Sequence, residues 1–381
     1  MKFSETDLKL MQLIQRRNLS KEREKQYNAA FKELFFLLGK TPSQLLEVAK
    51  EEQQPYLDKN GFPRILAMDD RKVNEYQFLY HKYLDDKGNA ETTKKEEINT
   101  LRSFFREYYI DIPRPIKFHT RPNRLRISDI PTWKDVKNSL NYCKNSREKA
   151  IVSFIATTGI RESDVVNFTI KDFLDATDIY HNGDINDLLA KNPFDIVPCY
   201  DFMPIKTVNQ GNLCITFNTG ECSYYIFEYL KERIKKGYSV ESDDPLFRGL
   251  KHPHFMKPAV ILRMFQRLNK ELKSGKDKNG IYGKFRSHNL RKLFSTTCRR
   301  NITKINVNGD KYTDLDVISV FTGHTPPNMS NSEVYDAVDS VDGDNNYLRK
   351  IYESLIPYFR INTEIELLNT HAIEIEYFNE V

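Results

Sequence analysis

Two short segments hold side chains that together could break a phosphodiester bond. In SHNLRKLFSTT, His288 and Arg291 are three residues apart, which is close to one helical turn. In TGHTPPNMSNSEVYDA, His324 precedes a single tyrosine, Tyr335. An arginine can hold the anionic phosphate, histidines can donate or position protons, and a tyrosine can attack the phosphorus. This combination could perform phosphoryl transfer without a metal or another cofactor.

Two further segments add a second arginine, a carboxylate and a lysine. TTGIRESDVVNF places Arg161 directly after a glycine and three residues before Asp164, so we expect both on one helix face. Arg161 could bind phosphate while Asp164 orients its neighbours, although a surface ion pair is the simpler interpretation of this pair alone. Lys206 lies in MPIKTVNQGN, at the edge of an expected hairpin, where it could protonate a leaving 5′ oxygen.

Each of these residues also has a plainer interpretation. Exposed lysines are common in hairpins, and His324 could be a core histidine with satisfied hydrogen bonds. Tyr335 is one of 21 tyrosines in the chain. A phenol with an ordinary pKa of about 10 is protonated at neutral pH and needs neighbouring cations or a base to become a nucleophile.

Composition indicates a folded protein with two or three domains. The chain has 381 residues, of which 39% are hydrophobic and 29% charged. We find neither a membrane-length apolar stretch nor a signal peptide, and therefore expect a cytoplasmic protein without a membrane partner. The five cysteines form no CxxC pair, which favours reduced thiols without structural zinc. The net charge of +5 is mild, but basic clusters contrast with an acidic C-terminus.

Hydrophobic periodicity predicts a mainly α fold with a small antiparallel β-sheet. Four or five helices are expected within residues 1–112, with breaks near Gly39 and Thr41. A proline- and arginine-rich linker, 113–131, follows. The remaining predicted segments are an α+β domain over 132–360, whose strands flank NQGN, and a tail over 361–381.

The order of the candidate residues resembles the tyrosine recombinase (phage-type integrase) family. TGIRESD resembles the first arginine box, PIKT the strand-turn lysine, HNLR the second box and TGH the second histidine. The helical half resembles the family's core-binding (SAM-like) domain, most closely that of archaeal and archaeal-virus integrases. The resemblance covers about residues 17–360 and implies a catalytic set of Arg161, Asp164, Lys206, His288, Arg291, His324 and Tyr335.

The resemblance implies a reaction and its partners. Tyr335 would attack double-stranded DNA to form a 3′-phosphotyrosyl bond, and a 5′ hydroxyl of a second duplex would reverse the step without a cofactor. Four protomers would act on two duplexes, and the recombination would move a mobile element. The predicted phosphate contacts of the helical half are Lys94, Lys95, Arg102 and Arg106, for which a solvated helix face is the alternative.

Several alternatives remain open at this stage. The interval between His324 and Tyr335 is slightly longer than is usual in the family and contains prolines, so Tyr347 and Tyr352 are rival nucleophiles. A type IB topoisomerase-like enzyme would share the chemistry, and a non-catalytic relative would only bind DNA. The tail after Pro357 would dock on a neighbouring protomer or lie loosely on the surface.

Overall fold

The computed structural model describes residues 7–118, 127–208, 211–252, 254–277, 280, 282–305, 311–326 and 346–361. The chain divides into two compact units, Met1–Asn123 and Arg124–Val381. Within the described residues, no helix combines the length and the apolar character that crossing a membrane requires.

The first unit is built from helices around an aromatic core that includes Phe31, Tyr80 and Phe104. Helix α2 ends at a left-handed Gly39, and the Thr41 side chain caps α3, as predicted for both positions. The helices are α1 (Leu8–Arg16), α2 (Lys21–Leu38), α3 (Pro42–Gln53), α4 (Lys72–Asp86) and α5 (Glu91–Glu107).

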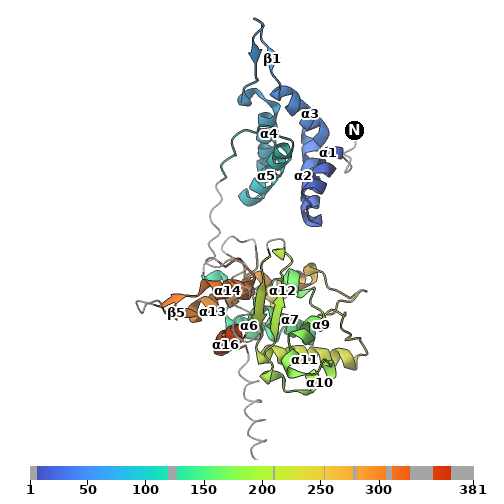
Figure 1. Cartoon of the computed structure of the whole chain (residues 1–381), viewed down its shortest axis with the longest axis vertical. Helices are drawn as coiled ribbons and strands as arrows, with labels where there is room; N and C mark the ends of the chain where they lie inside the picture. Colours follow the sequence, from blue (N-terminus) through green and yellow to red (C-terminus); the bar gives the residue numbers. More distant parts are fainter. Residues whose placement is uncertain are drawn as a thin grey trace, which may run out of the picture. The chain divides into compact units, whose positions relative to one another are not determined.

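A β-hairpin that the sequence did not predict follows α3. Strands β1 (Tyr56–Leu57) and β2 (Pro63–Arg64) pair antiparallel and extend beyond the ends of the neighbouring helices (Figure 1). The Asp58 carboxylate organises the turn, since it accepts hydrogen bonds from the backbone N–H groups of Asn60 and Phe62.

The second unit wraps further helices around one buried helix, α7. Every residue of α7 from Ala150 to Thr158 is buried, and α7 packs most extensively against α11 and α13. Its helices are α6 (Trp133–Leu140), α7 (Ser146–Thr158), α8 (Glu162–Val165), α9 (Ile170–Asp175), α10 (Ile185–Ala190), α11 (Gly220–Lys235), α12 (Pro258–Glu271), α13 (Ser287–Asn301), α14 (Leu315–Thr322) and α16 (Asn346–Leu355).

Two antiparallel strand pairs complete the described part of this unit. Strands β3 (Cys199–Phe202) and β4 (Cys214–Phe217) pair in the register Cys199↔Phe217, and β5 (Thr303–Ile305) pairs with β6 (Lys311–Thr313). The prediction of a mainly α fold with small antiparallel sheets, a helical part and an α+β part is confirmed (Figure 1).

Candidate functional site

The end of α7 brings two candidate arginines together. Gly159 caps α7 with φ +68°, and a Cβ atom at this position would lie 2.3 Å from the Phe294 ring on α13. Glycine therefore allows α13 to approach α7 closely. Where α13 contacts the end of α7, the Arg291 guanidinium donates a hydrogen bond to the carbonyl of Gly159, which is two residues before Arg161.

Both guanidinium groups are anchored on the turn that follows α14. Arg161 Nη2 donates to the Gly323 carbonyl at 3.3 Å, and Arg291 Nη2 donates to the Thr322 carbonyl. Arg161 Nη1 is buried without a hydrogen-bond partner. Burial first, and then the charge of Arg161, lower the pKa of Arg291 to about 10. Two adjacent cations with an unused N–H group form a site that favours an anion.

Asp164 connects this arginine pair to the chain segment that carries Lys206. Its side chain is buried, and Oδ1 accepts a hydrogen bond from the Ile205 backbone N–H at 3.0 Å. Burial raises the pKa of Asp164, while the Ile205 N–H, Arg161 and Arg291 oppose this change. Asp164 Oδ2 has no hydrogen-bond partner. The carboxylate therefore positions the β3–β4 connection beside the guanidinium groups.

The β3–β4 connection packs directly on the glycine–histidine turn. Gly323 has φ +56°, and a Cβ atom there would lie 2.6 Å from the Pro204 side chain. The amide of Asn212 and the hydroxyl of Thr325 exchange hydrogen bonds at 3.1 and 3.2 Å. Lys206 is exposed on this connection. The structure thus places Lys206 beside the segment that carries His324.

Both candidate histidines are held in the neutral form. Burial first, and then Lys292 and Arg286, lower the pKa of His288 to about 4. Burial first, and then Arg291 and Arg161, lower the pKa of His324 to about 4. The charge of Lys206 contributes to both shifts. The two imidazoles therefore share one field of cations at the same site.

Hydrogen bonds assign the tautomer of His324. Nδ1 lies 2.8 Å from the Thr322 hydroxyl, which itself donates to the Ile318 carbonyl. The hydroxyl must then accept from Nδ1–H, which leaves the lone pair on Nε2. Nε2 lies 3.4 Å from Arg291 Nη2, a group that can only donate. The position of Thr322 two residues before His324 was a signal that sequence reasoning did not use.

Ser287 links the start of α13 to α8. Arg286 occupies the N-cap position of α13 without a side-chain hydrogen bond, and Ser287 is the first helical residue. The Ser287 hydroxyl donates instead to the carboxylate of Glu162 on α8. This contact, also missed from the sequence, joins the start of α13 to the segment of Arg161.

Two of the three candidate nucleophilic tyrosines lie within the described residues. Tyr335 lies outside the described residues. Tyr352 is 0% exposed, and its hydroxyl donates to the Thr157 carbonyl at 2.8 Å. Burial raises the pKa of Tyr352 well above the usual value for a phenol, which disfavours it as a nucleophile. Tyr347 is exposed on α16.

Two of the four predicted DNA contacts lie in the interior of the first unit. Lys94 is 8% exposed and forms ion pairs with Asp85 and Glu91. Arg102 is 4% exposed and donates to the Pro113 carbonyl at 2.8 Å. These charges stabilise the unit itself, so we no longer expect phosphate contacts from Lys94 or Arg102. The other two, Lys95 and Arg106, are exposed.

Within the described ranges, no three side chains of histidine, cysteine, aspartate or glutamate converge as metal ligands would.

No family model matches the sequence. No curated protein matches it either.

Several solved structures are similar to the chain. The XerA recombinase is 18% identical over 91% of this chain and 95% of its own, with a TM-score of 0.34. The XerH site-specific recombinase bound to its difH substrate is 16% identical over 93% and 82%, with a TM-score of 0.47. A Tn1549 transposon integrase in complex with a circular intermediate DNA is 13% identical over 86% and 92%, also with a TM-score of 0.47.

Proposed function

We propose that this chain is a site-specific DNA recombinase or integrase that cuts and rejoins strands through a 3′-phosphotyrosyl intermediate. The observation that carries the proposal is the meeting of Arg161 and Arg291 on one turn, with a buried guanidinium nitrogen unused. A phosphodiester is an anion that could accept from both groups. The neutral histidines and the exposed Lys206 supply proton-transfer groups beside it.

The proposed first step exchanges one phosphorus–oxygen bond for another. The phenolic oxygen of Tyr335 bonds to phosphorus while the bond to the 5′ oxygen breaks. A neutral His288 can accept the phenol proton, and Lys206 can give a proton to the leaving 5′ oxygen. A 5′ hydroxyl from a second duplex then attacks the phosphotyrosine and releases Tyr335. The bond energy is retained, so strand exchange needs no ATP.

The two arginines would stabilise the extra negative charge of the pentacoordinate phosphorus. His324 requires a change of protonation state to help them. Its Nε2 lone pair faces Arg291, so donation to a phosphate oxygen requires a second proton on the ring. Binding of an anionic phosphate beside the ring favours that protonation. We therefore expect the pKa of His324 to rise when DNA binds.

The proposed partner is duplex DNA, to which a helical domain over 1–112 and a catalytic domain over 132–360 would each contribute contacts. Lys95 and Arg106 are the exposed candidates for phosphate contacts in the helical domain. The active assembly would be a homo-tetramer on two duplexes.

The test is capture of a covalent protein–DNA adduct. The full chain is incubated with fragmented genomic DNA that contains random nicks, because a nick near the cut lets a short strand diffuse away and traps the intermediate. Adducts that survive denaturing electrophoresis, and whose DNA shares one junction sequence, support the proposal. A lack of adducts across all fragments, from protein that binds DNA, would leave only a non-catalytic DNA-binding relative.

A second assay separates recombination from topoisomerase-like activity. Two duplexes of different length that both carry the captured sequence are incubated with the protein. Recombination predicts joined products of new length. Relaxation of supercoiled plasmid without any joining of the two duplexes would contradict the assignment as a recombinase.

A further inference from the structure

A second basic site lies at the end of α7 opposite the candidate catalytic residues. It is a hollow of about 290 Å³ beside the first turn of α7, whereas Arg161 follows the last turn. The 13 residues of α7 separate the two by about 20 Å at 1.5 Å per residue. Four cations line the hollow, namely Arg147, Arg233, Lys236 and Arg248.

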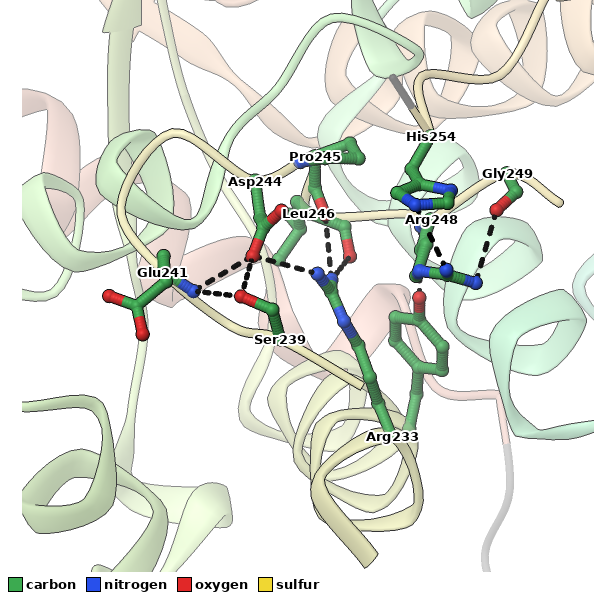
Figure 2. A network of polar contacts seen from close by, with 10 residues as sticks. Arg233, Ser239, Glu241, Asp244, Pro245, Leu246, Arg248, Gly249 and His254 are labelled. Atoms are coloured by element: carbon green, nitrogen blue, oxygen red, sulfur yellow. Dashed lines mark hydrogen bonds and ion pairs between the residues drawn. The ribbon is translucent and has the colours of Figure 1, made fainter. Parts of the chain in front are cut away.

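Arg233 is the most informative of these cations because it is 3% exposed. Its Nη1 donates to the Pro245 carbonyl at 2.7 Å, and its Nη2 lies 3.5 Å from an oxygen of Asp244 (Figure 2). Nη2 is thus engaged by the Asp244 carboxylate, whereas Nε has no hydrogen-bond partner. Burial is the main cause that lowers the pKa of Arg233, while Tyr229 and Asp244 oppose it. A buried guanidinium that lines a hollow and keeps one N–H group without an acceptor can take a further acceptor from a ligand.

Arg248 is held in place at the rim of the hollow. Its guanidinium lies 4.2 Å from the centre of the Tyr238 ring, which is a favourable cation–π distance. Its Nη2 lies 3.1 Å from Nε2 of His254, as Figure 2 shows. Arg147 donates to the Arg248 carbonyl and so fixes the backbone. A guanidinium that is already positioned loses little entropy when it binds a ligand.

One carboxylate among the residues that line the hollow, Glu232, opposes these cations. The Glu232 carboxylate accepts hydrogen bonds from the Ser146 hydroxyl and from Lys236. These contacts lower the pKa of Glu232 and keep it ionised. Four cations against two carboxylates, Glu232 in the lining and Asp244 behind Arg233, still leave a positive excess, to which the N-terminus of α7 adds its partial positive charge.

We propose that this hollow binds a small anion with more than one phosphate group, either inorganic pyrophosphate or a nucleoside diphosphate. Guanidinium groups on different sides suit the many oxygens of a polyphosphate better than one carboxylate. Only a ligand that enters the hollow reaches the buried Arg233, which disfavours the backbone of a DNA duplex. This inference is independent of the proposed recombinase function.

The test measures binding of sodium pyrophosphate, ADP and adenosine to the full chain by isothermal titration calorimetry. We expect pyrophosphate and ADP to bind and adenosine not to bind. Tighter binding of ADP than of pyrophosphate would assign a nucleotide, and equal binding would assign the phosphates alone as the recognised group. Lack of binding by both phosphate ligands would overturn the proposal.

Matched variants locate the binding. Lys236→Glu should weaken binding at least tenfold, whereas Lys235→Glu, at an exposed neighbour outside the hollow, should change it less than twofold. Arg248→Gln is a second variant, which removes another cation of the hollow. Its melting temperature shows whether the variant protein still folds. Arg161→Gln, at the other end of α7, should leave binding intact. The reverse pattern, with loss in Arg161→Gln and none in Lys236→Glu, would show that the ligand occupies the candidate catalytic site instead.

Discussion

At the scale of single residues, the unusual feature is a pair of guanidinium groups on one backbone turn. Burial first, and then repulsion from Arg161, lower the pKa of Arg291 to about 10. Asp164 offsets this repulsion only in part, because burial also raises the pKa of its carboxyl group. Binding of an anion removes the repulsion. The folded protein therefore holds a site that favours an anion.

The fixed geometry of Arg291 predicts that lysine cannot replace it. Arg291 donates to the Gly159 and Thr322 carbonyls at once, which a lysine cannot reproduce with the same planar fork. We expect Arg291→Lys to slow adduct formation by about 10²–10³-fold, as for loss of one transition-state donor. The control is Arg300→Lys, at an exposed position on the same helix. Equal rates for the two variants in single-turnover adduct assays would contradict the proposed role.

The neutral histidines predict a loss of stability in acid. Folding lowers the pKa of His288 from 6.5 to about 4, so between these values the unfolded chain binds more protons. Stability should therefore fall as the pH drops from 6.5 towards 4. His288→Gln should show a smaller fall in melting temperature over this range than the unchanged protein. The exposed control His252→Gln should behave like the unchanged protein; a matching effect of both variants would refute the assignment.

At the scale of elements, two glycine turns allow the candidate catalytic segments to come together. Gly159 brings α13 against the end of α7, and Gly323 seats the histidine turn on the β3–β4 connection. Both adopt the left-handed conformation that glycine tolerates best. Each turn therefore contributes both backbone conformation and close approach.

Substitution of Gly159 should separate these two contributions. Gly159→Ala adds left-handed strain of about 1–2 kcal/mol and overpacking against Phe294 of about 1–3 kcal/mol. Gly275→Ala, with φ +74° and open space around its Cβ position, adds the strain alone. We expect chemical denaturation to show the larger loss of unfolding free energy for Gly159→Ala. Equal losses of unfolding free energy in the two variants would mean that α7 and α13 can move apart to accommodate the added methyl group.

Some helices were predicted correctly from the sequence, whereas one hairpin and the burial of two cations were not. Helices with periodic apolar residues and clear caps, such as α2 and α3, were predictable because local signals specify them. The β1–β2 hairpin was missed because its stability depends on Asp58 contacts rather than on alternating apolar residues. Sequence patterns treat lysine and arginine as solvent-facing, so the ion pairs that cover Lys94 and the burial of Arg102 could not be foreseen. The candidate site residues were proposed from family motifs rather than from local propensity.

At the scale of the whole molecule, exposed and buried cations of the first unit should behave differently. If duplex DNA lies against the exposed Lys95 and Arg106, Lys95→Gln and Arg106→Gln should each weaken binding and reduce the salt slope by about 1. Arg102→Gln should instead lower the melting temperature, because it removes a buried donor to the Pro113 carbonyl. Fluorescence anisotropy across a salt series and thermal melting test this. An unchanged salt slope in both exposed variants would exclude these contacts.

The most direct measurement of the central claim compares three tyrosine variants in the adduct assay. We predict that Tyr335→Phe abolishes the covalent protein–DNA adduct while DNA binding and melting temperature stay unchanged. Tyr347→Phe should retain the adduct. Tyr352→Phe should retain it too, with about 1 kcal/mol less stability after loss of the hydrogen bond to the Thr157 carbonyl. An adduct that persists in Tyr335→Phe and disappears in Tyr347→Phe or Tyr352→Phe would contradict the account.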